Sequence, residues 1–140
     1  MILIGKNDQR HLIKGWYGIE RSPEGIYYRA SKPRALFVPC REGVTHVTLL
    51  LSARPEHTGM PLEVSLHSGE SGRGSFTLCC NGWTTRTAEI FIQPNVPVVI
   101  EIKNPWSPDS LYHNGDIRAL GILLSAIRFS PPYKMYTKNV

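Results

Sequence analysis

A long segment in the last third of the chain carries the side chains best suited to ligand chemistry. Residues 103–114 lack hydrophobic periodicity and contain Trp106, Asp109, Tyr112 and His113. Exposed aromatic rings can stack on the apolar face of a sugar, while neighbouring polar groups bind its hydroxyls. The alternative is that these aromatic side chains fill one end of the hydrophobic core. Both interpretations stay open, and these four residues are our first candidates for ligand binding.

A second group of aromatic residues precedes the first turn of the chain. Trp16 and Tyr17 lie between two glycines and could form another wall of the same site. Core packing is the alternative role of such rings, and we favour it for Trp16 and for Tyr28, which flank short strands.

Four charged residues require partners if they are buried: Glu20, Arg29, Asp116 and Arg118. Asp116 and Arg118 are two positions apart and would therefore lie on the same face of a strand. An Arg118–Glu20 ion pair would join the first turn region to the last strand, and guanidinium–carboxylate pairing suits that role. We favour structural use of these charges, in support of the candidate site. Asp116 could instead cap the turn before it.

The search for catalytic motifs finds little. The chain has no G-x-S-x-G elbow, no H-E-x-x-H motif and no phosphate loop, and the glycine-rich residues 69–74 indicate a connection between strands. Asp109, His113 and Asp116 are close enough in sequence to serve acid–base roles, which makes an enzyme the least favoured of three hypotheses. We therefore expect no enzymatic activity and no cofactor.

Metal binding and disulfide bonding are also not expected. His46 and His67 could meet on the polar face of paired strands, but the five histidines share no metal-ligand spacing. The three cysteines have no C-x-x-C spacing, and the adjacent pair would point to opposite sides of a strand. We expect buried free thiols at Cys40, Cys79 and Cys80.

Composition indicates one folded domain. The 140 residues are 41% hydrophobic and 19% charged, as in a globular domain rather than a disordered chain. The net charge of +5 comes from scattered basic residues without a dense cluster, so nucleic acid is not the expected partner. No apolar run reaches the roughly 18 residues of a membrane helix, so we expect no membrane span and a cytoplasmic location.

Short segments with period-two alternation predict an all-β fold. Residues 44–53 and 62–67 alternate apolar and polar side chains, and the dipeptide Asn81-Gly82 favours a tight hairpin between its flanking strands. The longest apolar run, residues 117–129, fits a strand better than a helix and would be the central strand of the sheet. Breaks are expected at residues 31–33 and at the glycine-rich connection.

These segments amount to eight or nine strands without a persuasive helix. We expect a single-domain, two-sheet β-sandwich of the jelly-roll type over residues 15–130. Residues 1–14 would be an N-terminal strand or leader, and residues 131–140 a C-terminal tail.

The spaced residues that carry a family resemblance are Gly15-Trp16-Tyr17, Glu20, Tyr28-Arg29-Ala30, Pro39, Asn104-Pro105-Trp106-Ser107-Pro108 and Asp116-Ile117-Arg118-Ala119-Leu120-Gly121-Ile122. This pattern resembles a small accessory domain that accompanies bacterial glycosyltransferases and methyltransferases of cell-surface polysaccharide synthesis. The resemblance implies a galactose-binding-like, carbohydrate-binding-module-like jelly roll without catalytic activity. It transfers no binding residue, since we know of no established binding residues in the family.

Two functions follow as leading hypotheses. The first is a binding module that holds a glycan or nucleotide-sugar near a glycosyltransferase or methyltransferase, in the same chain or as a separate protein. The second is a structural or protein-docking domain that forms a homodimer or captures a partner, which would require an exposed apolar patch.

Overall fold

The computed structural model of the chain describes residues 1–53, 61–79, 82–107 and 113–132. Nearly all of its regular structure is β. The elements in chain order are β1 (Ile2–Leu3), the 3-10 helix η1 (Asp8–Arg10), β2 (Leu12–Arg21), β3 (Tyr27–Phe37), β4 (Gly43–Ser52), β5 (Leu62–Ser68), β6 (Ser71–Leu78), β7 (Thr84–Ile92), β8 (Val98–Ile102) and β9 (Leu123–Ser130).

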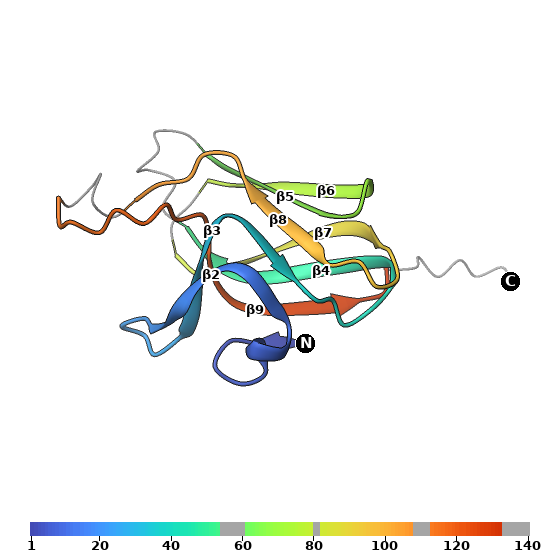
Figure 1. Cartoon of the computed structure of the whole chain (residues 1–140), viewed down its shortest axis with the longest axis horizontal. Helices are drawn as coiled ribbons and strands as arrows, with labels where there is room; N and C mark the ends of the chain where they lie inside the picture. Colours follow the sequence, from blue (N-terminus) through green and yellow to red (C-terminus); the bar gives the residue numbers. More distant parts are fainter. Residues whose placement is uncertain (54–60, 80–81, 108–112, 133–140) are drawn as a thin grey trace, which may run out of the picture.

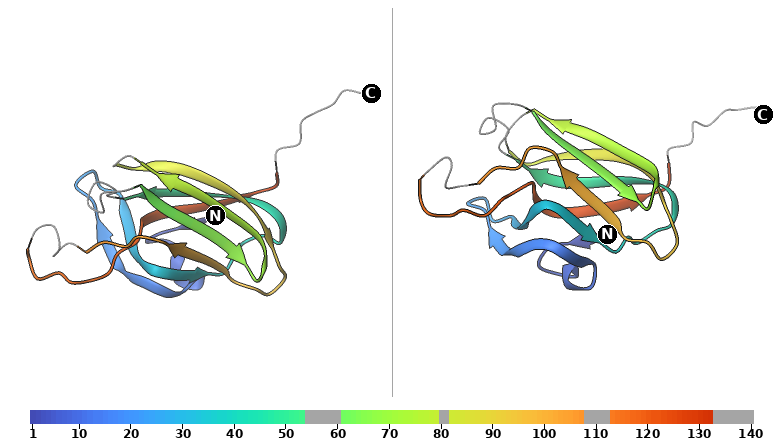
Figure 2. Two further views of the ribbon diagram at one scale, coloured as in Figure 1. Left: turned by 90° about the horizontal axis from the view of Figure 1, so that it is seen from above. Right: turned by 45° about the horizontal axis from the view of Figure 1, so that its top comes forward.

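The nine strands of the described residues form one antiparallel sheet. The strand order is β6-β5-β8-β3-β9-β4-β7, with β1 added to β9 and β2 added to β3. The sheet curls until it is nearly barrel-shaped, as the views in Figures 1 and 2 show. The predicted all-β class and strand number are thus confirmed, whereas the two-sheet sandwich and its jelly-roll arrangement stay predictions.

Strand β3 turns the corner of the sheet by changing its partner. Its first half pairs with β9 through Arg29 and Ala30, and its second half pairs with β8 through residues 34–37. The break predicted at residues 31–33 is therefore wrong, because one strand continues through it. Ser31 is buried there and its Oγ accepts a hydrogen bond from the backbone N of Ile122 at 3.0 Å. Pro33 follows in the stretch where the partner changes, so its missing N–H interrupts neither ladder.

Strand β9 lies in the middle of the sheet, as predicted, but it begins at Leu123 rather than at residue 117. It pairs with β1, β3 and β4. Two adjacent residues of β4 pair with residues 124 and 126, so Ser125 is the extra residue of a β-bulge. The bulge shifts the alternation and places both Leu124 and Ile127 in the core, fully buried. This shift, and not coverage of both faces, explains the ambiguous apolar pattern of the sequence.

The core is built from the inward-facing side chains of the curled sheet. The predicted alternation is confirmed in β4, where Val47, Leu49 and Leu51 are fully buried, and β5 follows the same pattern. Burial of each such side chain contributes about 1.5–3 kcal/mol relative to its exposure. Other fully buried large side chains are Phe37, Ile2, Leu62, Leu66, Leu78, Ile90, Ile92, Ile100 and Ile122.

The strands on either side of Asn81-Gly82 do not form the predicted hairpin ladder. Among the described residues, β6 pairs with β5 and β7 pairs with β4, so they are the two ends of the sheet. The predicted glycine-rich connection is largely part of β6. Its glycines permit close packing, because a Cβ at Gly74 would lie 2.8 Å from the carbonyl oxygen of Glu89 on β7. The two ends of the curled sheet therefore contact each other here, through β6 and β7. Asn81 lies outside the described residues.

The N-terminal segment packs onto the sheet. Residues 1–14 contribute β1, η1 and the start of β2, and Ile2 is completely buried against β9. Among the described residues, no helix has the length and apolar character needed to cross a membrane.

Two cysteines differ from expectation. Cys40 and Cys79 are exposed free thiols, so the prediction of buried thiols is wrong for both. Each lies just outside a strand, in a connection that the core does not cover. Cys80 lies outside the described residues.

Candidate functional site

Two of the predicted supporting residues, Asp116 and Glu20, contact a third, Arg118. Its Nε donates to Oδ1 of Asp116 at 2.8 Å, its Nη2 donates to Oδ2 at 2.7 Å, and its Nη1 lies 3.5 Å from Oε2 of Glu20. These hydrogen bonds hold the pKa of Asp116 below its usual value, and the carboxylate in turn raises the pKa of Arg118. The expected Arg118–Glu20 pair is present and connects β2 to the segment before β9.

Tyr17 belongs to the same network. The Arg118 guanidinium lies over its ring at 5.3 Å from the centroid, and Lys32 Nζ lies 5.6 Å from it. Its hydroxyl donates to the carbonyl of Ala119 at 3.2 Å. Cation–π contacts of this kind stabilise the ring in place. The ring is therefore already engaged with two cations, which weakens its predicted role as a stacking surface for a sugar.

Trp106 belongs to the segment between β8 and β9, part of which extends away from the sheet (Figure 1). Its backbone pairs with Leu120, and its indole Nε1 donates to the carbonyl of Gly121 at 3.2 Å. It lines an open hollow of about 380 Å³ with Pro105, Ser107, Ile117 and Ala119. The ring is partly exposed and could still stack on a ligand, although the groups around it are mainly apolar.

Residues 116–119 lie between these two groups and contact both, since Ala119 also accepts from the Tyr17 hydroxyl. Ile117 and Ala119 line the Trp106 hollow, whereas Asp116 and Arg118 belong to the Tyr17 network. The turn before it is capped by the Asn114 side chain, which accepts from the backbone N of Asp116 at 3.0 Å. The predicted cap by Asp116 is therefore wrong.

Of the remaining loop candidates, the structure describes His113. His113 is exposed, with a backbone φ of 50°, and Asp109 and Tyr112 lie outside the described residues. Asp116, the third residue of the acid–base hypothesis, is held by Arg118.

Trp16 and Arg29 hold β2 against β3. The Trp16 indole donates to the carbonyl of Leu36 at 2.9 Å and packs against the core, as favoured from the sequence. Arg29 donates its Nε to Asp8 at 2.7 Å and its Nη1 to the carbonyl of Tyr17 at 3.0 Å. Asp8 is only 2% exposed, so this is an internal ion pair.

Tyr28 forms a tilted aromatic pair with Trp83, with ring centroids 5.7 Å apart. Burial raises the pKa of Tyr28, the Glu20 carboxylate raises it further, and Arg118 acts in the opposite direction. Its hydroxyl therefore stays protonated at neutral pH.

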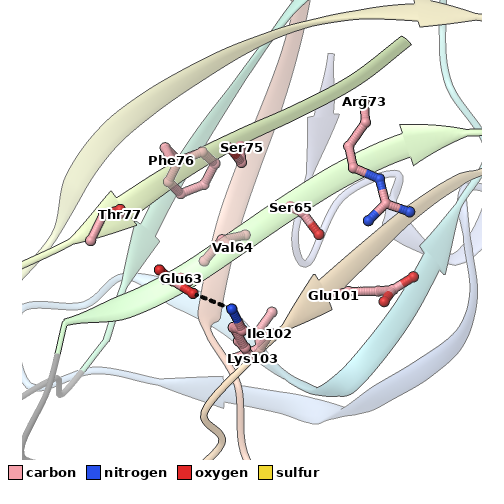
Figure 3. Close-up of a pocket in the computed structure, with 10 residues that line it drawn as sticks. All are labelled: Glu63, Val64, Ser65, Arg73, Ser75, Phe76, Thr77, Glu101, Ile102 and Lys103. Carbon is pink, nitrogen blue, oxygen red and sulfur yellow. Dashed lines mark ion pairs between the residues drawn. The ribbon is translucent and has the colours of Figure 1, made fainter. Parts of the chain in front are cut away.

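A hollow of larger volume than the one at Trp106 lies on the outer face of β5, β6 and β8 (Figure 3). It has a volume of about 450 Å³. Cross-strand pairing aligns its polar side chains in rows, with Ser65 beside Ser75 and Glu63 beside Thr77. We call this hollow the β5–β6–β8 groove; its lining residues are Glu63, Val64, Ser65, Arg73, Ser75, Phe76, Thr77, Glu101, Ile102 and Lys103.

Ion pairs occupy most of the charged groups of the groove. Lys103 lies 3.2 Å from Glu63, and His67 Nε2 lies 2.9 Å from Glu101. The hydrogen bond from His67 lowers the pKa of Glu101, against a smaller opposing effect of burial, and nearby Arg73 and the His67 charge lower it further. The Glu101 carboxylate is therefore an ionised acceptor at neutral pH.

His46 and His67 do not meet on paired strands, as the metal hypothesis required. His46 lies on β4 and bonds Glu89 of β7 at 2.8 Å, whereas His67 lies on β5, which pairs with β6 and β8 among the described residues. No cluster of three potential metal ligands occurs in the described ranges of the chain.

Sequence reasoning missed the groove because it depends on strand neighbours. The polar face of residues 62–67 was visible from alternation, but its partners were not: the glycine-rich stretch forms part of β6, and β8 is distant in sequence. Neither protein-family models nor curated protein sequences give a match to this chain.

Proposed function

We propose that the chain is a non-catalytic carbohydrate-binding module that holds a glycan in the β5–β6–β8 groove. The observation that carries this proposal is the groove itself, a hollow of about 450 Å³ lined by three hydroxyl side chains and flanked by ionised groups. Binding pockets for small molecules commonly span about 300–1,000 Å³.

The chemistry of the groove suits a polyhydroxylated ligand. Ser65, Ser75 and Thr77 can each donate and accept hydrogen bonds, as sugar hydroxyls do. Glu63 and Glu101 add carboxylate oxygens as acceptors, and hydrogen bonds to charged groups are about twice as strong as neutral ones. Because the groove lies on a sheet, strand pairing fixes the spacing of these groups before a ligand arrives.

The electrostatics favour binding over catalysis. A general acid in glycoside hydrolysis needs a carboxyl with a raised pKa. In the groove, the pKa of Glu101 is lowered, and Glu63 is paired with Lys103. Attachment to a glycosyltransferase or methyltransferase, and a galactose-binding-like jelly-roll ancestry of the curled sheet, belong to the same proposal and rest on the sequence resemblance.

Affinity electrophoresis in gels containing bacterial surface polysaccharides tests the proposal. We expect retardation of the native chain, and a loss of affinity of about thirtyfold when Ser75 and Thr77 are both changed to Ala, since each of the two lost hydrogen bonds contributes about 1 kcal/mol. Thr87→Ala, which removes a hydroxyl from the outer face of β7, is the matched control. Equal migration of native chain and double variant in every polysaccharide would overturn carbohydrate binding in the groove.

A docking or dimerisation domain is the second candidate, favoured by an apolar hollow at the end of the sheet. Ile13 and Val38 are 49% and 42% exposed there, beside Pro39, Val96 and Pro97. Light scattering over a range of protein concentrations tests this function, which predicts a dimer that Val38→Lys dissociates. A monomer at all concentrations would exclude dimerisation through this surface.

A further inference from the structure

The charges around the β5–β6–β8 groove are not fully matched. Lys103 is paired with Glu63, and Glu101 is hydrogen-bonded by His67. Arg73 lines the groove, yet no carboxylate in the described part of the chain lies within ion-pair distance of its guanidinium. Of the charged side chains that line the groove, Arg73 is thus the one without an ion-pair partner among the described residues.

A second arginine adds to this excess of positive charge. Arg34 on β3 is directly opposite Glu101 in the strand pairing, is exposed, and likewise has no carboxylate within ion-pair distance among the described residues. Both arginines act on Glu101 electrostatically from a distance. Three cations therefore accompany two carboxylates in and beside the groove even when His67 is neutral, which favours an anionic ligand.

The orientation of Arg73 directs this charge into the groove. Figure 3 shows its side chain reaching from β6 over β5, with the guanidinium on the side of Ser65 and Glu101. A guanidinium has five N–H donors in a planar fork, and that fork matches the two oxygens of a carboxylate. Solvent can hydrogen-bond to these donors when no ligand is bound. A ligand carboxylate would displace that solvent and form a bidentate ion pair with the guanidinium.

Building on the carbohydrate-binding function proposed above, we propose that the groove selects an acidic saccharide, whose carboxylate binds Arg73 while its hydroxyls bind Ser65, Ser75 and Thr77. Arg73, Ser75 and Thr77 alternate along β6 and share one face. At about 3.3 Å per residue they span roughly 13 Å. This length suits a di- or trisaccharide that carries a uronic acid at the Arg73 end.

A matched pair of ligands tests the selectivity. Isothermal titration calorimetry with trigalacturonate and with neutral galactotriose should give a dissociation constant at least about tenfold lower for the acidic trisaccharide, or about 1.4 kcal/mol. Arg73→Gln should abolish this preference by weakening the binding of trigalacturonate much more than that of galactotriose. Arg73→Lys, which keeps the charge but removes the planar fork, should retain part of the preference.

Arg128→Gln is the control because Arg128 is an exposed arginine on β9 and its loss changes the net charge equally. Equal loss of preference in the Arg73→Gln and Arg128→Gln variants would overturn the specific role of Arg73. Equal affinity of the native chain for both trisaccharides would overturn acidic selectivity while leaving carbohydrate binding intact. Tighter binding of a phosphorylated trisaccharide than of trigalacturonate would overturn the assignment of a carboxylate. Binding of none of these ligands, together with no retardation in any polysaccharide gel, would overturn the proposed function itself.

Discussion

The segment before β9 and the β5–β6–β8 groove use their arginines in opposite ways. Arg118 has two carboxylate partners and lies over the ring of Tyr17. Arg73 lines an open hollow and has no carboxylate partner at ion-pair distance among the described residues. A guanidinium whose donors are bound within the protein has little capacity left for a ligand, so the comparison separates charges that hold the fold from a charge available for binding.

Arg29 belongs to the first kind and is the most buried example. Its side chain is 18% exposed and that of Asp8 only 3% exposed, and the two are joined at 2.7 Å. Asp8 also accepts from the backbone N of Gly5 at 2.9 Å, so the pair ties η1 to β3.

The largest expected effect is therefore on Asp8. Asp8→Ala leaves Arg29 partly buried without its carboxylate, and we expect a loss of about 2–3 kcal/mol in the free energy of unfolding. Urea denaturation followed by tryptophan fluorescence measures this loss. Asp8→Asn should lose less, because an amide oxygen can still accept a hydrogen bond. A loss of less than about 0.5 kcal/mol in the free energy of unfolding of Asp8→Ala would show that the Asp8–Arg29 pair does not stabilise the fold, which contradicts the comparison with Arg73.

Substitution of the two compared arginines, Arg118 and Arg73, should have smaller effects on stability. Arg118→Ala removes a bidentate pair that is about one-third exposed, so solvent screening limits the expected loss of stability to about 1 kcal/mol. Arg73→Ala removes an exposed arginine without an ion-pair partner, and its effect should stay within about 0.5 kcal/mol. Thermal unfolding of the two variants under identical conditions gives both values. Equal losses would show that the two arginines do not differ in structural role.

The smallest effect concerns pH. The pKa of Glu101 is lowered in the folded state from 4.5, so its ionised form stabilises the protein above pH 4.5, and this contribution is lost as the pH falls through the lowered pKa. Glu101→Gln should therefore be slightly less stable than the native chain at neutral pH, by a few tenths of a kcal/mol because the side chain is exposed. The difference should vanish below the folded-state pKa. A constant difference between pH 3 and pH 7, measured by urea denaturation, would contradict this role.

Local patterns in the sequence were sufficient for features that depend on one strand. The alternation around Val47, Leu49 and Leu51 predicted their burial, because neighbouring side chains of a strand point to opposite faces. The Arg118–Glu20 pair could also be predicted from the sequence, since both charges lie at the ends of apolar segments. The prediction that Trp16 packs against the core had the same basis.

Features that depend on strand neighbours could not be predicted in this way. Nothing local distinguishes the continuous strand at Pro33 from a break, because the change of partner there is a property of β8 and β9. The glycines of β6 disfavour a strand by propensity, but Gly74 is required for contact with β7. The groove combines residues of three strands, so its position became visible only with the strand order.

The partner exchange in β3 has a consequence for how the chain acquires its structure. β3 pairs with residues 98–101 and 123–124, which lie in the last third of the chain. Contacts between residues so far apart in sequence slow folding, because a long loop must close before they form. During synthesis, β3 therefore cannot complete its pairing until residue 124 has left the ribosome, so assembly of the sheet is a late step of folding.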